Sequence, residues 1–149
     1  MRAVVQRVIN CSVAAAGKIV GNINKGILVY LGVEENDSEK DVKYITDKVI
    51  NLRIFNDYNN KMNLSLKDIG GELLLVSQFT LLGDVRRGRR PSYSRAADPE
   101  YAKKYYHLTL RAFKESGLKV EAGRFREVME INYTNIGPVT ILLDSRKLF

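Results

Sequence analysis

The chain has few of the side chains on which most enzymes rely for catalysis. It contains one cysteine, Cys11, and one histidine, His107, in 149 residues. A single cysteine forms no internal disulfide and is typical of a reducing compartment. A zinc site needs three or four closely placed Cys, His or carboxylate ligands, and the chain lacks the Cys and His to build one. We therefore expect a protein without a metal ion or another cofactor.

Long apolar segments are missing as well. No run of about 18 apolar residues occurs, so no membrane-spanning helix is expected. The basic N-terminal segment does not read as a signal peptide, because Gln6, Arg7 and Asn10 interrupt its apolar residues. The sequence predicts a cytoplasmic protein.

The familiar catalytic motifs are also absent. The chain has no G-x-S-x-G elbow, no P-loop and no G-x-G-x-x-G motif. A Ser-His-Asp triad would have to recruit His107 from the middle of a predicted helix, and Cys11 lies in a predicted strand without a helper nearby. An enzyme with this sequence would depend on positioning, on backbone dipoles or on a catalytic group of its substrate.

Positive charge is in excess, with a formal net charge of +7. An excess of this size favours polyanionic partners, nucleic acid above all. Five arginines fall within the ten residues 86–95, in the segment RRGRRPSYSR. A charged segment is often only a solvated loop. With a nucleic-acid partner it would instead be a phosphate-binding site.

The order of elements predicts an α+β fold in one domain that spans residues 1–149. Short β-branched segments separated by glycines predict strands over 3–15, 18–23 and 26–35. Because no strand-helix-strand repeat is evident, we expect mainly antiparallel strands. The strands outnumber what two helices can cover, so we expect a barrel-like closure or burial of the sheet in a homodimer.

Two principal helices are predicted, over 38–52 and 98–117. Ser38 and Asp41 form a capping-box pattern, whereas Asp98 followed by Pro99 is typical of a helix N-terminus.

The segment SQFTL (77–81) places polar residues inside the most apolar predicted strand, 72–82. In one interpretation these side chains simply face solvent. In the other, the end of this strand lines a pocket in which backbone N–H groups receive a ligand oxygen.

The segment NIGPVT (135–140) interrupts a predicted strand with Pro138, one of only three prolines. Proline removes a hydrogen-bond donor from a sheet and is usually confined to edges and bulges. A turn or bulge is the simplest interpretation. Alternatively, Gly137 leaves its carbonyl uncovered and Pro138 fixes the backbone, so that the pair presents a bare carbonyl to a ligand.

Together, SQFTL and NIGPVT resemble the two signature motifs of the D-aminoacyl-tRNA deacylases. The resemblance extends along essentially the whole chain and includes MRAVVQRV at its start, RRGRRPSYS and AGRF. It implies a compact β-barrel-like homodimer with active sites at the interface between the subunits. It also implies that the Gly137-Pro138 bond is cis and that this pair enters the pocket of the partner subunit.

The resemblance further implies hydrolysis of the ester bond in tRNA charged with a D-amino acid, and in mischarged glycyl-tRNA. L-aminoacyl-tRNA would be rejected because its side chain would collide with the rigid Gly-Pro backbone. In the family, the 2′-hydroxyl of the tRNA is thought to assist the attacking water. The expected partners are therefore the charged tRNA and a second copy of the chain.

The resemblance assigns roles to individual residues. Backbone N–H groups near Phe79 and Thr80 would be catalytic, as donors to the developing oxyanion. The expected substrate-binding residues are Ser77, Gln78, Gly137, Pro138, Arg7 and Met129, and the expected tRNA-binding residues are Arg86, Arg87, Arg89 and Arg90. Two of the substrate-binding residues have an alternative interpretation: Arg7 as a solvated strand residue, and Met129 as part of the core.

Two rival functions also fit the sequence. The first is a non-enzymatic basic module that binds tRNA or other RNA through the arginine segment. The second is an esterase that acts on small substrates through the hydroxyl of Ser77 or Thr80.

Overall fold

The computed structural model describes residues 1–149 and begins with a long hairpin. Strand β1 (Arg2–Ala15) pairs antiparallel with β2 (Lys18–Gly32), so the segments predicted as two strands over 18–23 and 26–35 are largely one strand. Ala16 and Gly17 connect them with φ angles of 48° and 72°. Two consecutive residues with positive φ form the turn that matches the twist of a hairpin.

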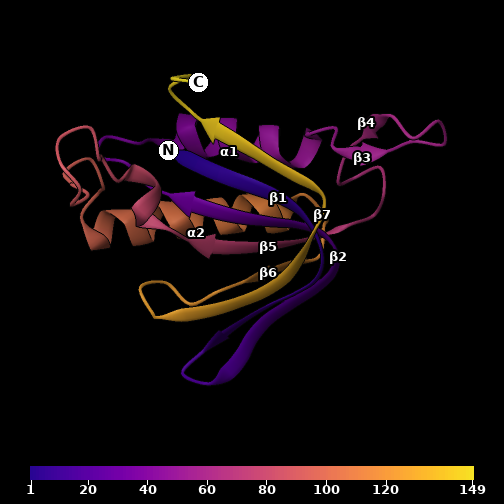
Figure 1. The fold of residues 1–149 in the computed structure, drawn as a ribbon, viewed down its shortest axis with the longest axis horizontal. Helices are drawn as coiled ribbons and strands as arrows, with labels where there is room; N and C mark the ends of the chain where they lie inside the picture. The colour runs from indigo at the N-terminus through magenta and orange to yellow at the C-terminus, as the bar shows by residue number, and fades with distance from the viewer.

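The hairpin forms part of a five-stranded mixed sheet with the order β6-β5-β2-β1-β7 (Figure 1). The other strands are β5 (Glu72–Ser77), β6 (Val120–Ala122) and β7 (Met129–Asp144). β7 pairs antiparallel with β1, whereas β2, β5 and β6 run parallel to one another. The predicted α+β class is confirmed. The predicted barrel-like closure is wrong, because the sheet is open. The sheet is mixed, and its two longest pairings, of β1 with β2 and of β1 with β7, are antiparallel as predicted.

The two helices lie in the connections that make parallel strand pairs possible. Helix α1 (Glu39–Asn51) lies in the connection from β2 to β5, and α2 (Pro99–Glu115) in the connection from β5 to β6. Parallel neighbours need a long crossover of this kind. The first crossover also contains a separate pair of short strands, β3 (Phe55–Asn56) and β4 (Met62–Leu64).

Both helices begin where the sequence predicts. The carboxylate of Asp41 accepts a hydrogen bond from the Ser38 N–H at 2.8 Å, which caps α1. The Asp98 carboxylate accepts from the backbone N–H groups of Glu100 and Tyr101, and Pro99 occupies the first helical position of α2. These caps satisfy N–H groups that have no partner inside a helix.

Strand β5 is buried on both faces of the sheet, and each face has its own core. Leu73 and Leu75 pack towards the helices, together with Ile45 of α1 and Phe113 of α2. The alternate residues of β5 join a second core on the opposite face, which contains Val8, Cys11, Val13, Ile23, Leu28, Leu74 and Val76. Burial on both faces explains why β5 is a continuous apolar run.

The second core lies where the long strands bend. Strands β1, β2 and β7 extend past the helices and curve away from them (Figure 1). The pairing of β1 with β7 shifts register between Ile9 and Ser12, and Asn10 there has a φ of 50°. Such bulges increase strand curvature, which lets the sheet cover its own second core. No helix combines the length and the apolarity that a membrane span requires.

Candidate active site

The first motif lies where β5 stops. The strand ends at Ser77, and a short 3-10 helix, η1 (Phe79–Leu82), follows. The single strand predicted over 72–82 is therefore wrong in its second half. The Gln78 N–H donates to the Leu31 carbonyl at 2.8 Å, which is the last link to the sheet before the chain turns. Apolar residues continue through the turn, so their pattern alone does not reveal it.

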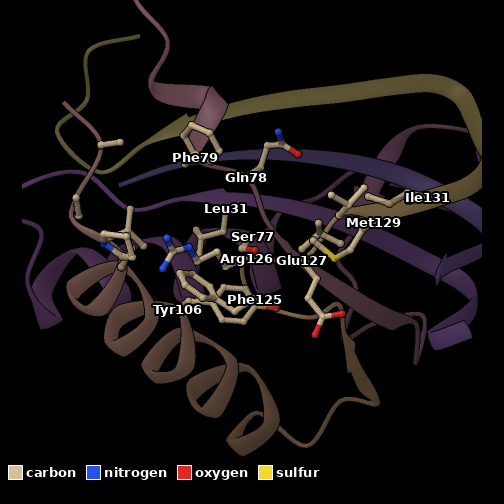
Figure 2. Close-up of a pocket in the computed structure, with 17 residues that line it drawn as sticks. Leu31, Ser77, Gln78, Phe79, Tyr106, Phe125, Arg126, Glu127, Met129 and Ile131 are labelled. Carbon is tan, nitrogen blue, oxygen red and sulfur yellow. The ribbon is translucent and has the colours of Figure 1, made fainter. Parts of the chain in front are cut away.

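A cavity of about 600 Å³ opens beside this strand end (Figure 2). Ser77, Gln78 and Phe79 form one wall, and Tyr106 of α2 and Phe125 form others. Of its 17 lining residues, 12 are hydrophobic, so the cavity presents a largely apolar surface to a bound group. Sequence reasoning missed Tyr106 and Phe125. The AGRF segment was noted for its resemblance, but no local pattern indicated that Phe125 would face α2.

Backbone donors are available at this wall. Phe79 and Thr80 are the first residues of η1, so their N–H groups have no partner within that helix. No hydrogen bond of the turns and loops uses either group. Phe79 is 58% exposed and lines the cavity. Thr80 does not line it, and its hydroxyl accepts a hydrogen bond from the Gln78 side-chain amide.

The second motif lies in a bulge of β7. Thr140 pairs with Gln6 and Asn135 pairs with Val8, so four residues of β7 lie opposite Arg7 alone. The Gly137-Pro138 bond in this bulge is cis, which confirms the expectation, and Gly137 has a φ of 124°. Both residues are exposed and neither lines the cavity of this chain.

Hydrogen bonds hold this bulge from two sides. Arg7 Nε donates to the Ile136 carbonyl at 2.9 Å, and Arg7 Nη1 donates to the Ile54 carbonyl at 2.6 Å. The Asn135 side chain accepts from the Val139 N–H at 3.0 Å. A Cβ atom at Gly137 would lie 2.7 Å from Arg7 Nη2, so a side chain there would displace this arginine. Arg7 is thus in contact with the loop rather than free in solvent.

Met129 has two environments at once. It lines the cavity and also packs against the second core. Both interpretations of this residue, cavity wall and core packing, therefore describe its position.

The cavity offers little acid-base chemistry. Its ionisable lining residues are Tyr106, Arg126 and Glu127, and burial raises the pKa of the Tyr106 phenol. His107 is exposed on α2 and lies outside the cavity. Burial in the second core raises the pKa of the Cys11 thiol to about 11, which keeps it protonated and unreactive. No group of three or more His, Cys, Asp or Glu side chains comes together as a metal site.

Comparison with known proteins decides the family. A sequence model described as D-Tyr-tRNA(Tyr) deacylase matches residues 4–144. The chain belongs to this deacylase family. The family predicted from SQFTL and NIGPVT is therefore confirmed.

Relatives of this deacylase agree along their full length. Proteins named D-aminoacyl-tRNA deacylase from Thermosipho africanus and Halothermothrix orenii are 58% and 57% identical over the whole of both chains. A solved structure titled c-Myc DNA Unwinding Element Binding Protein superposes with a TM-score of 0.91 at 36% identity, over 97% of this chain and 98% of that one. A probable eukaryotic D-amino acid tRNA deacylase has the same fold, with a TM-score of 0.85 at 16% identity over 95% of this chain and 97% of that one.

The predicted tRNA-binding arginines of this deacylase share one exposed loop, residues 83–95, which we call the arginine loop. Asp84 pairs with Ser92 across its base, and Tyr93 packs edge-on against Phe79 with ring centroids 5.1 Å apart. The loop is therefore attached to the wall of the cavity. Sequence reasoning noted Tyr93 among the arginines but did not predict this contact.

The four arginines are not equivalent. Arg86 Nε donates to the Asp84 carboxylate at 2.9 Å, and this pairing holds the pKa of Asp84 well below its usual range. Arg87, Arg89 and Arg90 are exposed and have no carboxylate partner. Arg86 is thus partly neutralised, whereas the other three carry unpaired charge.

Proposed function

We propose that this chain hydrolyses the ester of D-aminoacyl-tRNA to free D-amino acid and tRNA. The observation that carries the proposal is a largely apolar cavity with the backbone N–H of Phe79 at one wall, in a member of a deacylase family. The one carboxylate that lines this cavity, Glu127, pairs with Arg124 at 3.7 Å. An aminoacyl ester is activated by its own α-ammonium group and needs mainly positioning and charge stabilisation. That requirement matches what the cavity offers.

In this mechanism, water adds to the ester carbonyl carbon and the carbonyl oxygen becomes an oxyanion. The N–H groups of Phe79 and Thr80 stabilise that charge, and each donor of this kind contributes about 2.7–4 kcal/mol. The bond to the ribose oxygen then breaks, and that oxygen takes a proton. The 2′-hydroxyl of the terminal ribose assists the attacking water, whereas the carboxylate of Glu127 in the cavity lining pairs with Arg124. Ser77 and Gln78 line the same wall and hold the ester in place.

The chiral filter in this proposal is the Gly137-Pro138 backbone of a second copy. Both residues are exposed and lie outside the cavity of their own chain, so a homodimer would bring them to the partner's cavity. The Gly137 carbonyl then accepts a hydrogen bond from the α-ammonium. An L side chain would point into this backbone, whereas a D side chain points to solvent. Glycine has no side chain to collide, so glycyl-tRNA is also a substrate.

The surface around the bulge favours a second copy. β7 is an edge strand of 16 residues, and long unpaired edges are usually covered in native assemblies. On this strand Leu142 is 57% exposed and Ile136 is 37% exposed. Apolar side chains on an open edge fit an interface between subunits better than contact with water.

The D-versus-L deacylation assay tests the activity. D-tyrosyl-tRNA should lose its amino acid at catalytic enzyme concentrations while L-tyrosyl-tRNA persists, and equal rates would refute the filter. D-tyrosyl-tRNA ending in 2′-deoxyadenosine should be nearly inert, and rapid turnover of it would refute assistance by the 2′-hydroxyl.

The same assay separates the rival functions. Binding of tRNA without any turnover would indicate the non-enzymatic module. Hydrolysis of small esters without tRNA would indicate a hydroxyl nucleophile.

Mixing two impaired variants tests the shared site. Phe79→Pro impairs the cavity of one copy, and Gly137→Ala impairs the filter of the other copy. If each site combines one copy's cavity with the other's filter, random mixing restores about one quarter of the sites. No recovery, with mixed dimers present by mass spectrometry, would mean that both motifs act within one chain.

A further inference from the structure

Arg126 has a backbone conformation that an arginine rarely adopts. It lies in the turn between β6 and β7 with a φ of 65°. Residues other than glycine, asparagine and aspartate seldom occupy this region, and they are strained there. The turn closes with a bond from the Glu127 N–H to the Arg124 carbonyl. This conformation directs Arg126 to the cavity wall, which it lines beside Phe125.

The guanidinium of Arg126 has no partner in the chain. The nearby carboxylate of Glu127 pairs instead with Arg124, at 3.7 Å. Figure 2 shows the Arg126 side chain extending across the cavity past Leu31 and Tyr106. The Arg126 side chain is exposed at the cavity lining, and the fork of donors of an arginine binds phosphate or carboxylate strongly.

We propose that Arg126 binds a phosphodiester of the substrate, the one that precedes the terminal nucleoside. This inference rests on the proposed function, because the cavity would then hold the nucleoside ester. The substrate's carboxyl group is esterified and uncharged, and its α-ammonium is positive. The phosphodiester is therefore the anion nearest to the ester, about one ribose away.

Two features of the site agree with this assignment. Ala96 and Ala97 follow the arginine loop directly and line the same cavity as Arg126, so a chain bound along the loop would reach the cavity that Arg126 lines. The Arg126 charge also repels the α-ammonium of the substrate. It would thereby favour the orientation in which this group faces the Gly137 carbonyl of the partner subunit.

The test compares a substrate with phosphates and a substrate without them. D-tyrosyl-tRNA and 3′-D-tyrosyl-adenosine are assayed with the wild type, Arg126→Gly and Arg126→Lys. For Arg126→Gly, the ratio of kcat/KM for the tRNA to that for the nucleoside ester should fall about tenfold, through KM, as expected for one lost charge-assisted contact. The salt dependence of log kcat/KM for the tRNA should become shallower by about 0.7 to 0.9. Arg126→Lys keeps the charge and should recover most of the salt slope.

Folding does not confound this test. Glycine relieves the positive φ at position 126, so Arg126→Gly should unfold at the same temperature as the wild type or higher. Arg124→Gln is the matched control, because Arg124 belongs to the same turn but does not line the cavity. An unchanged substrate ratio and salt slope in Arg126→Gly would overturn the assignment, as would an equal loss on both substrates.

Failure of the proposed function gives a different result. In that case the wild type hydrolyses neither substrate. Binding of uncharged tRNA then still tests Arg126, because the salt slope of Kd should differ between the wild type and Arg126→Gly. Equal slopes in that binding measurement would overturn the phosphate assignment on their own.

Discussion

The two motifs of the candidate site differ in how the chain holds them. Ser77 to Phe79 lie at the end of a strand that is buried between two cores, and they line the cavity. Gly137 and Pro138 lie in an exposed bulge of an edge strand, outside that cavity. Apolar packing fixes the first motif, whereas a few polar contacts fix the second. One chain thus carries both motifs without bringing them to one cavity, which motivates the proposed dimer.

This contrast predicts different sensitivities to mutation. At the first motif the backbone N–H groups should matter more than the side chains. At the second motif the absence of a side chain, and the arginine that braces it, should matter most.

The largest effect is expected for Phe79→Pro. Proline is tolerated at the first position of a helix, and here it removes one N–H donor. Loss of an oxyanion donor should lower kcat about 10²–10³-fold. Phe79→Ala is the control, since it removes the ring but keeps the N–H. Similar kcat values for the two variants in single-turnover assays would exclude this N–H as the donor.

A smaller effect is expected for Gly137→Ala. The added Cβ would lie 2.7 Å from Arg7 Nη2 and 2.8 Å from Val139 Cγ2, so these side chains must shift, and the φ of 124° is strained for alanine. We expect kcat/KM for D-tyrosyl-tRNA to fall about tenfold, in line with the cost of one strained residue. Gly117→Ala shares the positive φ, at 81°, but has no atom within 4 Å of the new Cβ. Equal deacylation by both variants would show that the bulge does not contact the substrate.

Arg7→Ala should act through the bulge. It removes the donors to the Ile136 and Ile54 carbonyls, and the buried Ile54 carbonyl then lacks this partner. Such a loss costs about 1–3 kcal/mol of the free energy of unfolding. We also expect the ratio of D to L deacylation to fall about fivefold, because a looser backbone excludes L side chains less well. Lower stability with unchanged selectivity would limit Arg7 to a structural role.

The arginine loop should give modest effects on KM. Arg87→Ala, Arg89→Ala and Arg90→Ala should each raise KM for D-tyrosyl-tRNA about threefold and flatten its salt dependence by about 0.7 to 0.9. Arg86→Ala should change both less, because Asp84 already pairs with that arginine. The ranking is checked by kcat/KM at several salt concentrations. A larger effect at Arg86 than at its neighbours would contradict it.

The smallest effect is expected for Thr80→Ala. The Thr80 hydroxyl accepts a hydrogen bond from Gln78 and has no base beside it, so it is a weak nucleophile. The substitution keeps the backbone N–H, and kcat should fall less than about twofold. A loss as large as that of Phe79→Pro would assign the chemistry to the hydroxyl.

Local signals in the sequence determined the hairpin, both helices and the two motifs. Ser38 and Asp98 cap their helices through side chains close to them in the chain, so their pattern is sufficient to predict the helix starts. The glycine and proline of NIGPVT likewise indicated a break in a strand. The family followed from these motifs, because their order and spacing are properties of the sequence.

Only the tertiary structure decided the parallel arrangement of β2, β5 and β6, the end of β5 at Ser77, and the cavity that Tyr106, Phe125 and Arg126 share. Each depends on contacts between residues far apart in the chain. Local propensity and hydrophobic period carry no information about which distant surfaces pack together. The sequence therefore determined which pieces form, and packing between them determined where the candidate site lies.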